Sequence, residues 1–105
     1  GFLDHVQQVA SHLRQQLAMI VERNSDIFEE VRGTGLLLGL KCRPLNTEVG
    51  AAFRARGLVT ANAGDNVVRL LPPLIIEGKH VSEAVGMIEA ACTDLRKTQS
   101  QRKVG

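Results

Sequence analysis

Two one-sided apolar helical patterns, one toward each end of the chain, constrain the fold more than any other feature. Between Leu3 and Ile20, and again between Val81 and Leu95, apolar residues recur every three or four positions, which predicts two amphipathic helices. Each helix has to cover its apolar stripe with another layer, and a chain of 105 residues can build one domain with a real core. The apolar positions are Leu3, Val6, Val9 or Ala10, Leu13, Leu17 and Ile20 in the first pattern, and Val81, Ala84, Val85, Ile88, Ala91 or Cys92 and Leu95 in the second.

The segment that follows the first helix predicts a pair of strands. Short polar residues at 24–26 compete with the backbone for its hydrogen bonds and should end the helix. Residues 27–42 are β-compatible on both sides of a Gly-Thr-Gly at 33–35, which predicts two strands joined by a turn or bulge. Three consecutive leucines at 36–38 predict burial on both faces.

A short helix is predicted after Pro44. Asn46 or Thr47 can cap its start, and Gly57 can end it. This helix separates the first pair of strands from the strands predicted further along the chain.

The next segment predicts more strands. Residues 58–64 and 67–71 have strand character and are separated by a turn at Gly64 and Asp65. Two prolines at 72–73 should end ladder pairing, and residues 74–76 predict a last short strand.

The order helix, strand pair, helix, strands, helix predicts an α+β fold. We expect a two-layer sandwich in which a small, mostly antiparallel sheet is covered by amphipathic helices. Residues 1–95 should form the domain, and residues 96–105, which are basic and do not continue the apolar stripe, should form a frayed tail.

Charge and composition argue against several classes of protein. The net charge is +2, but four basic residues lie in the last ten, and without them nine basic residues face eleven acidic ones. With no Trp or Tyr and three Phe, the chain lacks the basic patch and stacking aromatics of a nucleic-acid-binding domain. No apolar stretch reaches the roughly 20 residues of a membrane span, and the N-terminus lacks the layout of a signal peptide. We therefore expect a cytoplasmic protein with no nucleic-acid or membrane partner.

The histidines and cysteines predict no metal site. Cys42 and Cys92 are far apart in the sequence and have no paired spacing, so two reduced thiols are expected. His5 and His12 lie on the first predicted helix without acidic or thiol neighbours at helical spacing. The glycines at 33–39 are followed by a strand pattern and not by a helix, which favours a turn over a phosphate-binding loop.

Arg69 is the candidate functional residue. It lies among aliphatic residues in the strand predicted over 67–71, where a charge is costly unless it has a partner. It could extend to water from an edge strand or pair with Asp65 or Glu77. Alternatively, it could present its planar guanidinium to a carboxylate, a task for which Arg is better shaped than Lys.

These residues resemble a known family. "EVRGTGLLLGL", followed by "GLVTANAGDNVVRLLPPLII" and then an amphipathic helix, is similar to the C-terminal domain of the class III (subgroup II) pyridoxal-phosphate aminotransferases, and within them to the acetylornithine aminotransferases. The resemblance runs from about Leu3 to Leu95 in the same order. It implies the small C-terminal domain of a fold-type I aminotransferase.

The resemblance also implies an activity for the parent protein. The parent would transfer an amino group from N-acetylornithine to 2-oxoglutarate through pyridoxal phosphate in arginine biosynthesis. Its partners would be the amino-acid substrate, 2-oxoglutarate, a large cofactor-binding domain of the same chain and a second subunit in a homodimer. The chain starts with Gly1 and enters the helical pattern almost at once, so we expect a fragment.

Residue by residue, the resemblance assigns the substrate-carboxylate arginine to Arg69. It places Asn62 and Gly64 in a loop that approaches the active site, and it gives Arg32 and Gly33 an architectural role in a turn. No catalytic, cofactor-binding or metal-binding residue is assigned.

The lysine that forms the Schiff base lies upstream in the family, and the lysines here, at 41, 79, 97 and 103, do not have its setting. The phosphate cradle and the aspartate that pairs with the pyridine nitrogen are also upstream. The fragment alone should therefore be inactive.

Other interpretations remain open from the sequence. Within the family, the parent could use succinylornithine, ornithine or 4-aminobutyrate. Outside it, the chain could be a free-standing α+β module that binds a small molecule or a protein.

Overall fold

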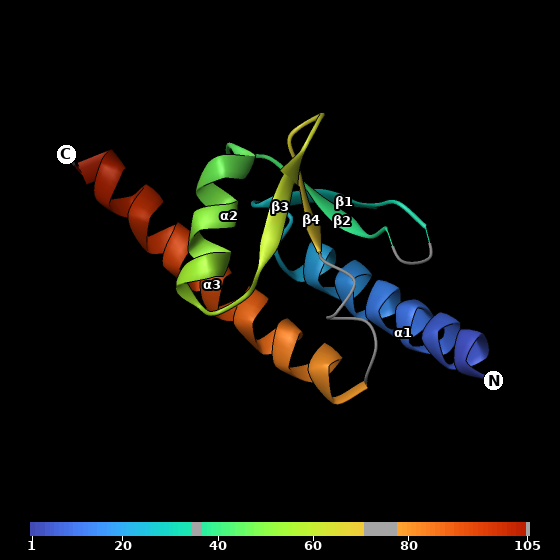
Figure 1. Ribbon diagram of the computed structural model, residues 1–105. Helices are drawn as coiled ribbons and strands as arrows, with labels where there is room; N and C mark the ends of the chain where they lie inside the picture. The colour runs from blue at the N-terminus through green and yellow to red at the C-terminus, as the bar shows by residue number, and fades with distance from the viewer. Residues whose placement is uncertain (35–36, 71–77, 105) are drawn as a thin grey trace.

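The computed structural model describes residues 1–34, 37–70 and 78–104, and within these ranges the chain forms three helices and a four-stranded sheet (Figure 1). This is the α+β architecture predicted from the pattern of apolar residues. The elements are α1 (Phe2–Arg23), β1 (Phe28–Arg32), β2 (Gly39–Cys42), α2 (Asn46–Ala55), β3 (Thr60–Ala63), β4 (Val67–Leu70) and α3 (Gly78–Val104).

The sheet is antiparallel throughout and has the strand order β1-β2-β4-β3. Helix α1 lies along β1, α2 lies along β3 and β4, and α3 packs against both α1 and α2. The inward side chains of the sheet, including Leu40, Val68 and Leu70, join one core cluster with residues of all three helices. The result is two layers, one of helices and one of strands.

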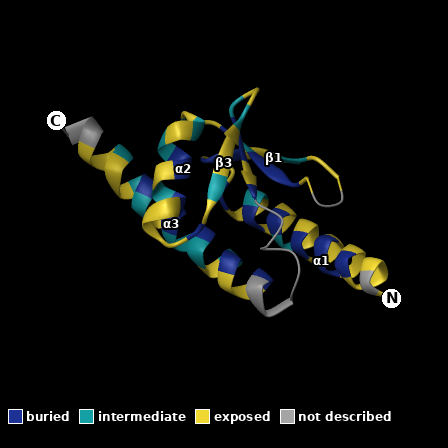
Figure 2. Cartoon of the chain, in the orientation of Figure 1, coloured by how far each residue is buried: buried dark blue, intermediate teal, exposed yellow. Residues whose placement is uncertain are grey.

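The apolar stripes of the two long helices are buried, as Figure 2 shows for the sides of α1 and α3 that face the core. In α1 the stripe runs from Val6 to Ile20, and in α3 it runs from Val81 to Leu95. Leu3 was predicted to belong to the first stripe, but 74% of its surface is exposed. It lies in the first turn of α1, beyond the part of the helix that the core reaches.

Helix α1 ends where the sequence predicts. Asn24 follows the last helical residue and is buried, and its Nδ2 donates a hydrogen bond of 2.9 Å to the carbonyl oxygen of Ile20. The backbone amide of Asn24 also donates to this carbonyl oxygen at 2.9 Å, so Asn24 holds the last turn of the helix with both its backbone and its side chain.

The capping prediction for α2 was wrong. Leu45 occupies the N-cap position, and its side chain makes no capping hydrogen bond. The Nδ2 of Asn46 instead donates to the carbonyl oxygens of Ala63 and Val67, each at 3.1 Å. Gly57 follows the end of the helix with φ +90°, which confirms its predicted role.

The predicted burial of the leucines at 36–38 was also wrong in part. Leu38 is buried, but Leu37 is 60% exposed, and Leu36 lies outside the described residues. The amide of Leu37 donates to the carbonyl oxygen of Thr34, so this segment belongs to the turn that precedes β2 and not to the strand.

Strand β4 ends at Leu70 among the described residues. The predictions for Leu71, for the two prolines at 72–73 and for a strand at 74–76 fall outside them. Helix α3 continues to Val104, and the predicted fraying after Leu95 stays a prediction. In the described residues, no helix combines the length and the apolar character needed to cross a membrane.

Candidate functional site

Arg69 lies on the side of the sheet that faces away from the helices. Val68 and Leu70, its neighbours in β4, belong to the core cluster, whereas Arg69 is exposed. Because successive side chains of a strand point to opposite faces, the guanidinium of Arg69 extends from the outer face. Its partners across the ladder are Gly39 in β2 and Ala61 in β3, so only small residues flank it in the sheet.

The side chain of Arg69 lines a concavity of about 260 Å³ at this outer face. Complete small-molecule sites usually have volumes of roughly 300–1,000 Å³, so this concavity can receive one end of a small ligand. Its other walls come from β2, the end of β1 and the β3–β4 hairpin. The lining residues are Arg32, Gly33, Leu37, Gly39, Ala63, Gly64, Val67 and Arg69.

Two glycines shape the concavity. A Cβ atom on Gly39 would lie 2.8 Å from Cγ1 of Val67 and 2.9 Å from the carbonyl oxygen of Val68, closer than side-chain carbons approach other atoms. Gly33 has φ +89°, and a Cβ there would lie 1.6 Å from the carbonyl oxygen of Leu37. Only glycine fits either position, which agrees with an architectural role for Gly33.

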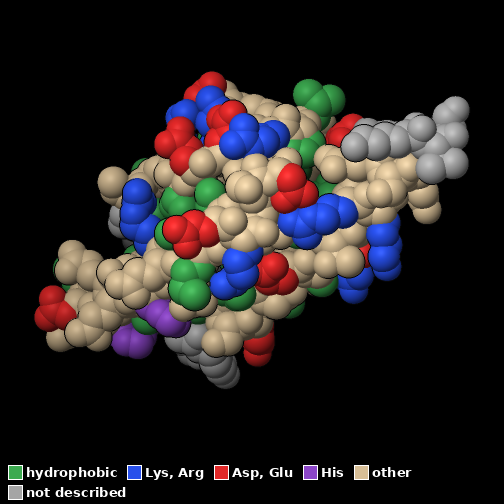
Figure 3. All heavy atoms as spheres, turned by 180° about the vertical axis from the view of Figure 1, so that it is seen from behind, with side chains coloured by type: hydrophobic (Ala, Val, Ile, Leu, Met, Phe, Trp, Pro, Cys, Tyr) green, Lys and Arg blue, Asp and Glu red, His purple; other side chains and the backbone are tan. Residues whose placement is uncertain are grey.

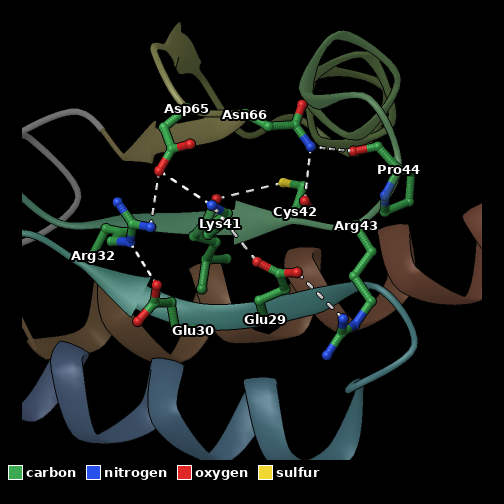
Figure 4. Close-up of polar contacts among 10 residues, drawn as sticks. Glu29, Glu30, Arg32, Lys41, Cys42, Arg43, Pro44, Asp65 and Asn66 are labelled. Carbon is green, nitrogen blue, oxygen red and sulfur yellow. Dashed lines mark hydrogen bonds and ion pairs between the residues drawn. The ribbon is translucent and has the colours of Figure 1, made fainter.

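The other cations beside the concavity already have acidic partners (Figure 4). Arg32 contacts Glu30 at 2.8 Å and Asp65 at 2.9 Å. Lys41 contacts Asp65 at 3.1 Å and Glu29 at 3.8 Å. Hydrogen bonds from Lys41 and then from Arg32 hold the pKa of the Asp65 carboxyl below its usual value of 3.8.

Arg69 differs from these neighbours. Among the described residues it has no hydrogen bond or ion pair with an acidic side chain. Asp65, one of the two partners considered from the sequence, is held by Arg32 and Lys41, and Glu77 lies outside the described residues. What the described part of the chain presents at the concavity is therefore a guanidinium without an internal counter-ion.

Asn62 and Gly64 occupy different positions relative to Arg69. Gly64 lines the concavity. Asn62 pairs with Val68 in the ladder and so faces the opposite side of the sheet, where its Oδ1 would lie 3.0 Å from a Cβ on Gly50 of α2. The structure therefore brings Gly64, but not Asn62, to the surface that holds Arg69.

The tip of the β3–β4 hairpin, residues 64–66, is fixed by contacts that sequence reasoning missed. Asp65 and Asn66 have φ of 62° and 61°. The Nδ2 of Asn66 donates to the carbonyl oxygens of Cys42 and Pro44, and its Oδ1 accepts from the amide of Asn46, each at 2.7 Å. A signal was present, because Asp and Asn adopt positive φ more readily than other residues with side chains.

Neither Lys41 nor Lys97 is placed to attach a carbonyl compound covalently at this concavity. The ammonium of Lys41 is held between two carboxylates, and Lys97 lies on α3 beside Arg96, away from this concavity. Burial raises the pKa of the Cys42 thiol to about 11 and that of the Cys92 thiol to about 12, so neither is a ready nucleophile. No cluster of three or more potential metal ligands occurs in the part of the chain that the structure describes.

The surface turned away from the viewer of Figure 1 carries charges of both signs. Figure 3 shows Lys and Arg side chains interspersed there with Asp and Glu. The ion pairs of the described residues include Arg56 with Asp94 at 2.7 Å and Arg96 with Asp26 at 2.8 Å.

Comparisons with known proteins agree on one family. The family described as Aminotransferase class-III matches residues 1–92. The acetylornithine aminotransferase 1 of Bradyrhizobium diazoefficiens is 44% identical over 102 residues, which are 97% of this chain and 25% of that protein. The acetylornithine aminotransferase of Rhodobacter capsulatus is 47% identical over 95 residues, which are 90% of this chain and 24% of that protein.

A solved structure shares the fold as well. The crystal structure of N-acetylornithine aminotransferase from Stenotrophomonas maltophilia superposes with a TM-score of 0.78 and 29% sequence identity, over 90% of this chain and 27% of that one. The chain thus spans about a quarter of the length of the proteins that it matches.

Proposed function

Because the chain belongs to the class-III aminotransferase family, we propose that it is the C-terminal small domain of an acetylornithine aminotransferase. The proposal is supported by relatives of that name at 44–47% identity over nine-tenths or more of the chain. The parent protein would transfer an amino group from N-acetylornithine to 2-oxoglutarate, in the cytoplasm, as a step of arginine biosynthesis. A separate binding module is no longer the better explanation, since the family match covers residues 1–92.

The family implies pyridoxal phosphate as the cofactor, which supplies the electron sink for amino-group transfer when it is bound. Lys41 and Lys97, the lysines whose side chains the structure describes, do not fit the cofactor, because Lys41 pairs with Glu29 and Asp65 and Lys97 lies away from the concavity. The cofactor would be held by a large domain of the same chain, and the parent would be a homodimer.

The domain's own contribution would be to hold the substrate carboxylate. The observation that carries this proposal is that the guanidinium of Arg69 lines the concavity without an acidic partner among the described residues, while Arg32 and Lys41 beside it are paired. A guanidinium can bind a carboxylate through two parallel hydrogen bonds, which orients as well as attracts it. The amino-acid donor and 2-oxoglutarate both carry a carboxylate next to the reacting carbon, so one arginine could serve both half-reactions.

Replacing Arg69 in the full-length, cofactor-loaded protein tests this role. Arg69→Lys keeps the charge but loses the planar pair of hydrogen bonds. We expect KM to rise for both substrates and kcat/KM to fall roughly ten- to a thousand-fold, the range for a lost hydrogen-bond pair between charged groups.

Arg56→Lys is the matched control. Arg56 also contacts a carboxylate, that of Asp94, but it lies at the end of α2 and does not line the concavity. The kinetics of this variant should stay within about twofold of the unmodified protein, as for surface changes away from a site. If the Arg69→Lys protein had the kinetics of the control, the proposed role of Arg69 would be refuted.

A further inference from the structure

Asp65 occupies a position that influences the charge of the concavity without lining it. Its carboxylate lies at the tip of the β3–β4 hairpin and bridges two cations from other strands, Arg32 of β1 and Lys41 of β2. Figure 4 shows the three side chains pointing toward one another across the outer face of the sheet. Gly64, the residue before Asp65, and Arg32 both line the concavity that holds Arg69.

Each cation of this bridge has two acidic partners. Arg32 has a second acidic partner in Glu30, and Lys41 has a second one in Glu29. Three carboxylates therefore surround two cations on one side of the concavity, whereas Arg69 has no acidic partner among the described residues. An incoming anion thus meets one uncompensated guanidinium instead of a group of three cations.

We propose that Asp65 determines where a carboxylate binds in this concavity, because it withholds Arg32 and Lys41 from the ligand and leaves Arg69 as the receiving group. The inference rests on the proposed function, since it takes the ligand to be a carboxylate substrate. Asp65 is a positioning residue and does not touch the ligand itself. Its role is to prevent a second, misplaced carboxylate site from forming at Arg32.

Asp65→Asn is a suitable perturbation. Asp65 has φ 62°, a conformation that Asn adopts at least as readily, so the hairpin tip should keep its shape while the negative charge is removed. The loss of that charge should make the concavity more attractive to anions. At the separations of neighbouring side chains in a watery setting, one unit charge changes an anion's affinity by a few-fold.

The test is inhibition of the full-length, cofactor-loaded protein by glutarate, a dicarboxylate without an amino or keto group. We expect the inhibition constant of glutarate to fall about threefold in Asp65→Asn at low ionic strength, and the gain to disappear in about 1 M salt, where exposed charges are screened. Misfolding or a lower active fraction cannot tighten inhibition. This gain therefore separates a change of charge from structural damage.

Three further variants make the interpretation specific. Asp65→Glu keeps the charge and should restore the original inhibition constant. The double variant Arg32→Gln with Asp65→Asn removes the released cation and should also lose the gain. Asp94→Asn breaks an ion pair of the same kind, with Arg56 on α2, and should leave the inhibition constant unchanged.

The two proposals fail in different ways. An unchanged or weaker inhibition by glutarate in Asp65→Asn, together with weaker inhibition in Arg69→Lys, would overturn the role of Asp65 and leave that of Arg69. Inhibition that does not weaken in Arg69→Lys would overturn the proposed carboxylate site itself, whatever Asp65→Asn does.

Discussion

Asn66 offers the most direct test of how the hairpin tip is held. Its side chain makes three hydrogen bonds of 2.7 Å, as donor to the carbonyl oxygens of Cys42 and Pro44 and as acceptor from the amide of Asn46. It therefore ties the tip of the β3–β4 hairpin to the segment between β2 and α2. Asn66→Ala removes all three contacts at once.

The size of the effect follows from these contacts and from the backbone. A typical intramolecular hydrogen bond contributes about 1 kcal/mol, so three contribute about 3 kcal/mol. Asn66 also has φ 61°, which costs Ala about 1 kcal/mol more than it costs Asn. Since the site is only partly buried, water can satisfy some of the groups that are left. We therefore expect the free energy of unfolding to fall by about 2–4 kcal/mol.

Urea unfolding of the 105-residue chain at pH 7, followed by far-ultraviolet circular dichroism, measures this loss. Asn62→Ala is the matched control, because Asn62 lies exposed in the adjoining strand β3 and its side chain makes no hydrogen bond with the described residues. The control should change stability by less than about 0.5 kcal/mol. A loss below about 1 kcal/mol in Asn66→Ala would refute the argument, since the three hydrogen bonds would then not be what holds the tip.

Two other predictions follow from the pKa directions. Burial raises the pKa of Cys42 to about 11 and that of Cys92 to about 12. Both thiols should therefore react with a disulfide reagent at pH 8 far more slowly in the folded chain than in urea. Equal rates in the two states would contradict this prediction. Hydrogen bonds from Arg96 to Asp26, from Lys41 and then Arg32 to Asp65, and from Arg56 to Asp94 hold the pKa of these carboxyls below 3.8. The unfolded chain therefore binds more protons in acid than the folded chain. The unfolding temperature should be level from pH 7 to 5 and fall below about pH 4, and a rise at pH 3 would refute the assignment.

The long helices were predictable because their signal is local and repeated. The spacing of apolar residues in α1 and α3 fixes which side of each helix is buried, whatever the partner is. The end of α1 at Arg23 follows from the polar residues after it, since their side chains compete for backbone hydrogen bonds. The glycine at 57 marks the end of α2 for an equally local reason, its positive φ.

The errors have a different origin. Leu3 and Leu37 carry apolar side chains, but burial depends on whether another layer reaches them, and that is decided by distant parts of the chain. Asn46 looked like a cap because Asn is common there, yet its amide nitrogen contacts carbonyl oxygens of β3 and β4 instead. At Leu3 and Leu37 the covering layer is missing, whereas at Asn46 a long-range contact outweighed a local preference.

The charge of the concavity depends both on local sequence and on contacts between distant parts of the chain. The sequence shows that Arg69 lies among aliphatic residues, and it offers Asp65 as a nearby counter-ion. In the structure Asp65 forms ion pairs with Arg32 and Lys41 instead, which belong to strands earlier in the chain.

The other arginines show why this matters. Those at 23, 32, 43, 56 and 96 contact a carboxylate, and Arg14 donates to the carbonyl oxygen of Gly33. Among the described arginine side chains, Arg54 and Arg69 are the ones with neither kind of contact, and of these two only Arg69 lines the concavity. The amino-acid sequence alone cannot separate Arg69 from the rest by charge. What separates it is that acidic side chains neutralise its neighbours. A bound carboxylate would give Arg69 the acidic partner that its neighbours already have.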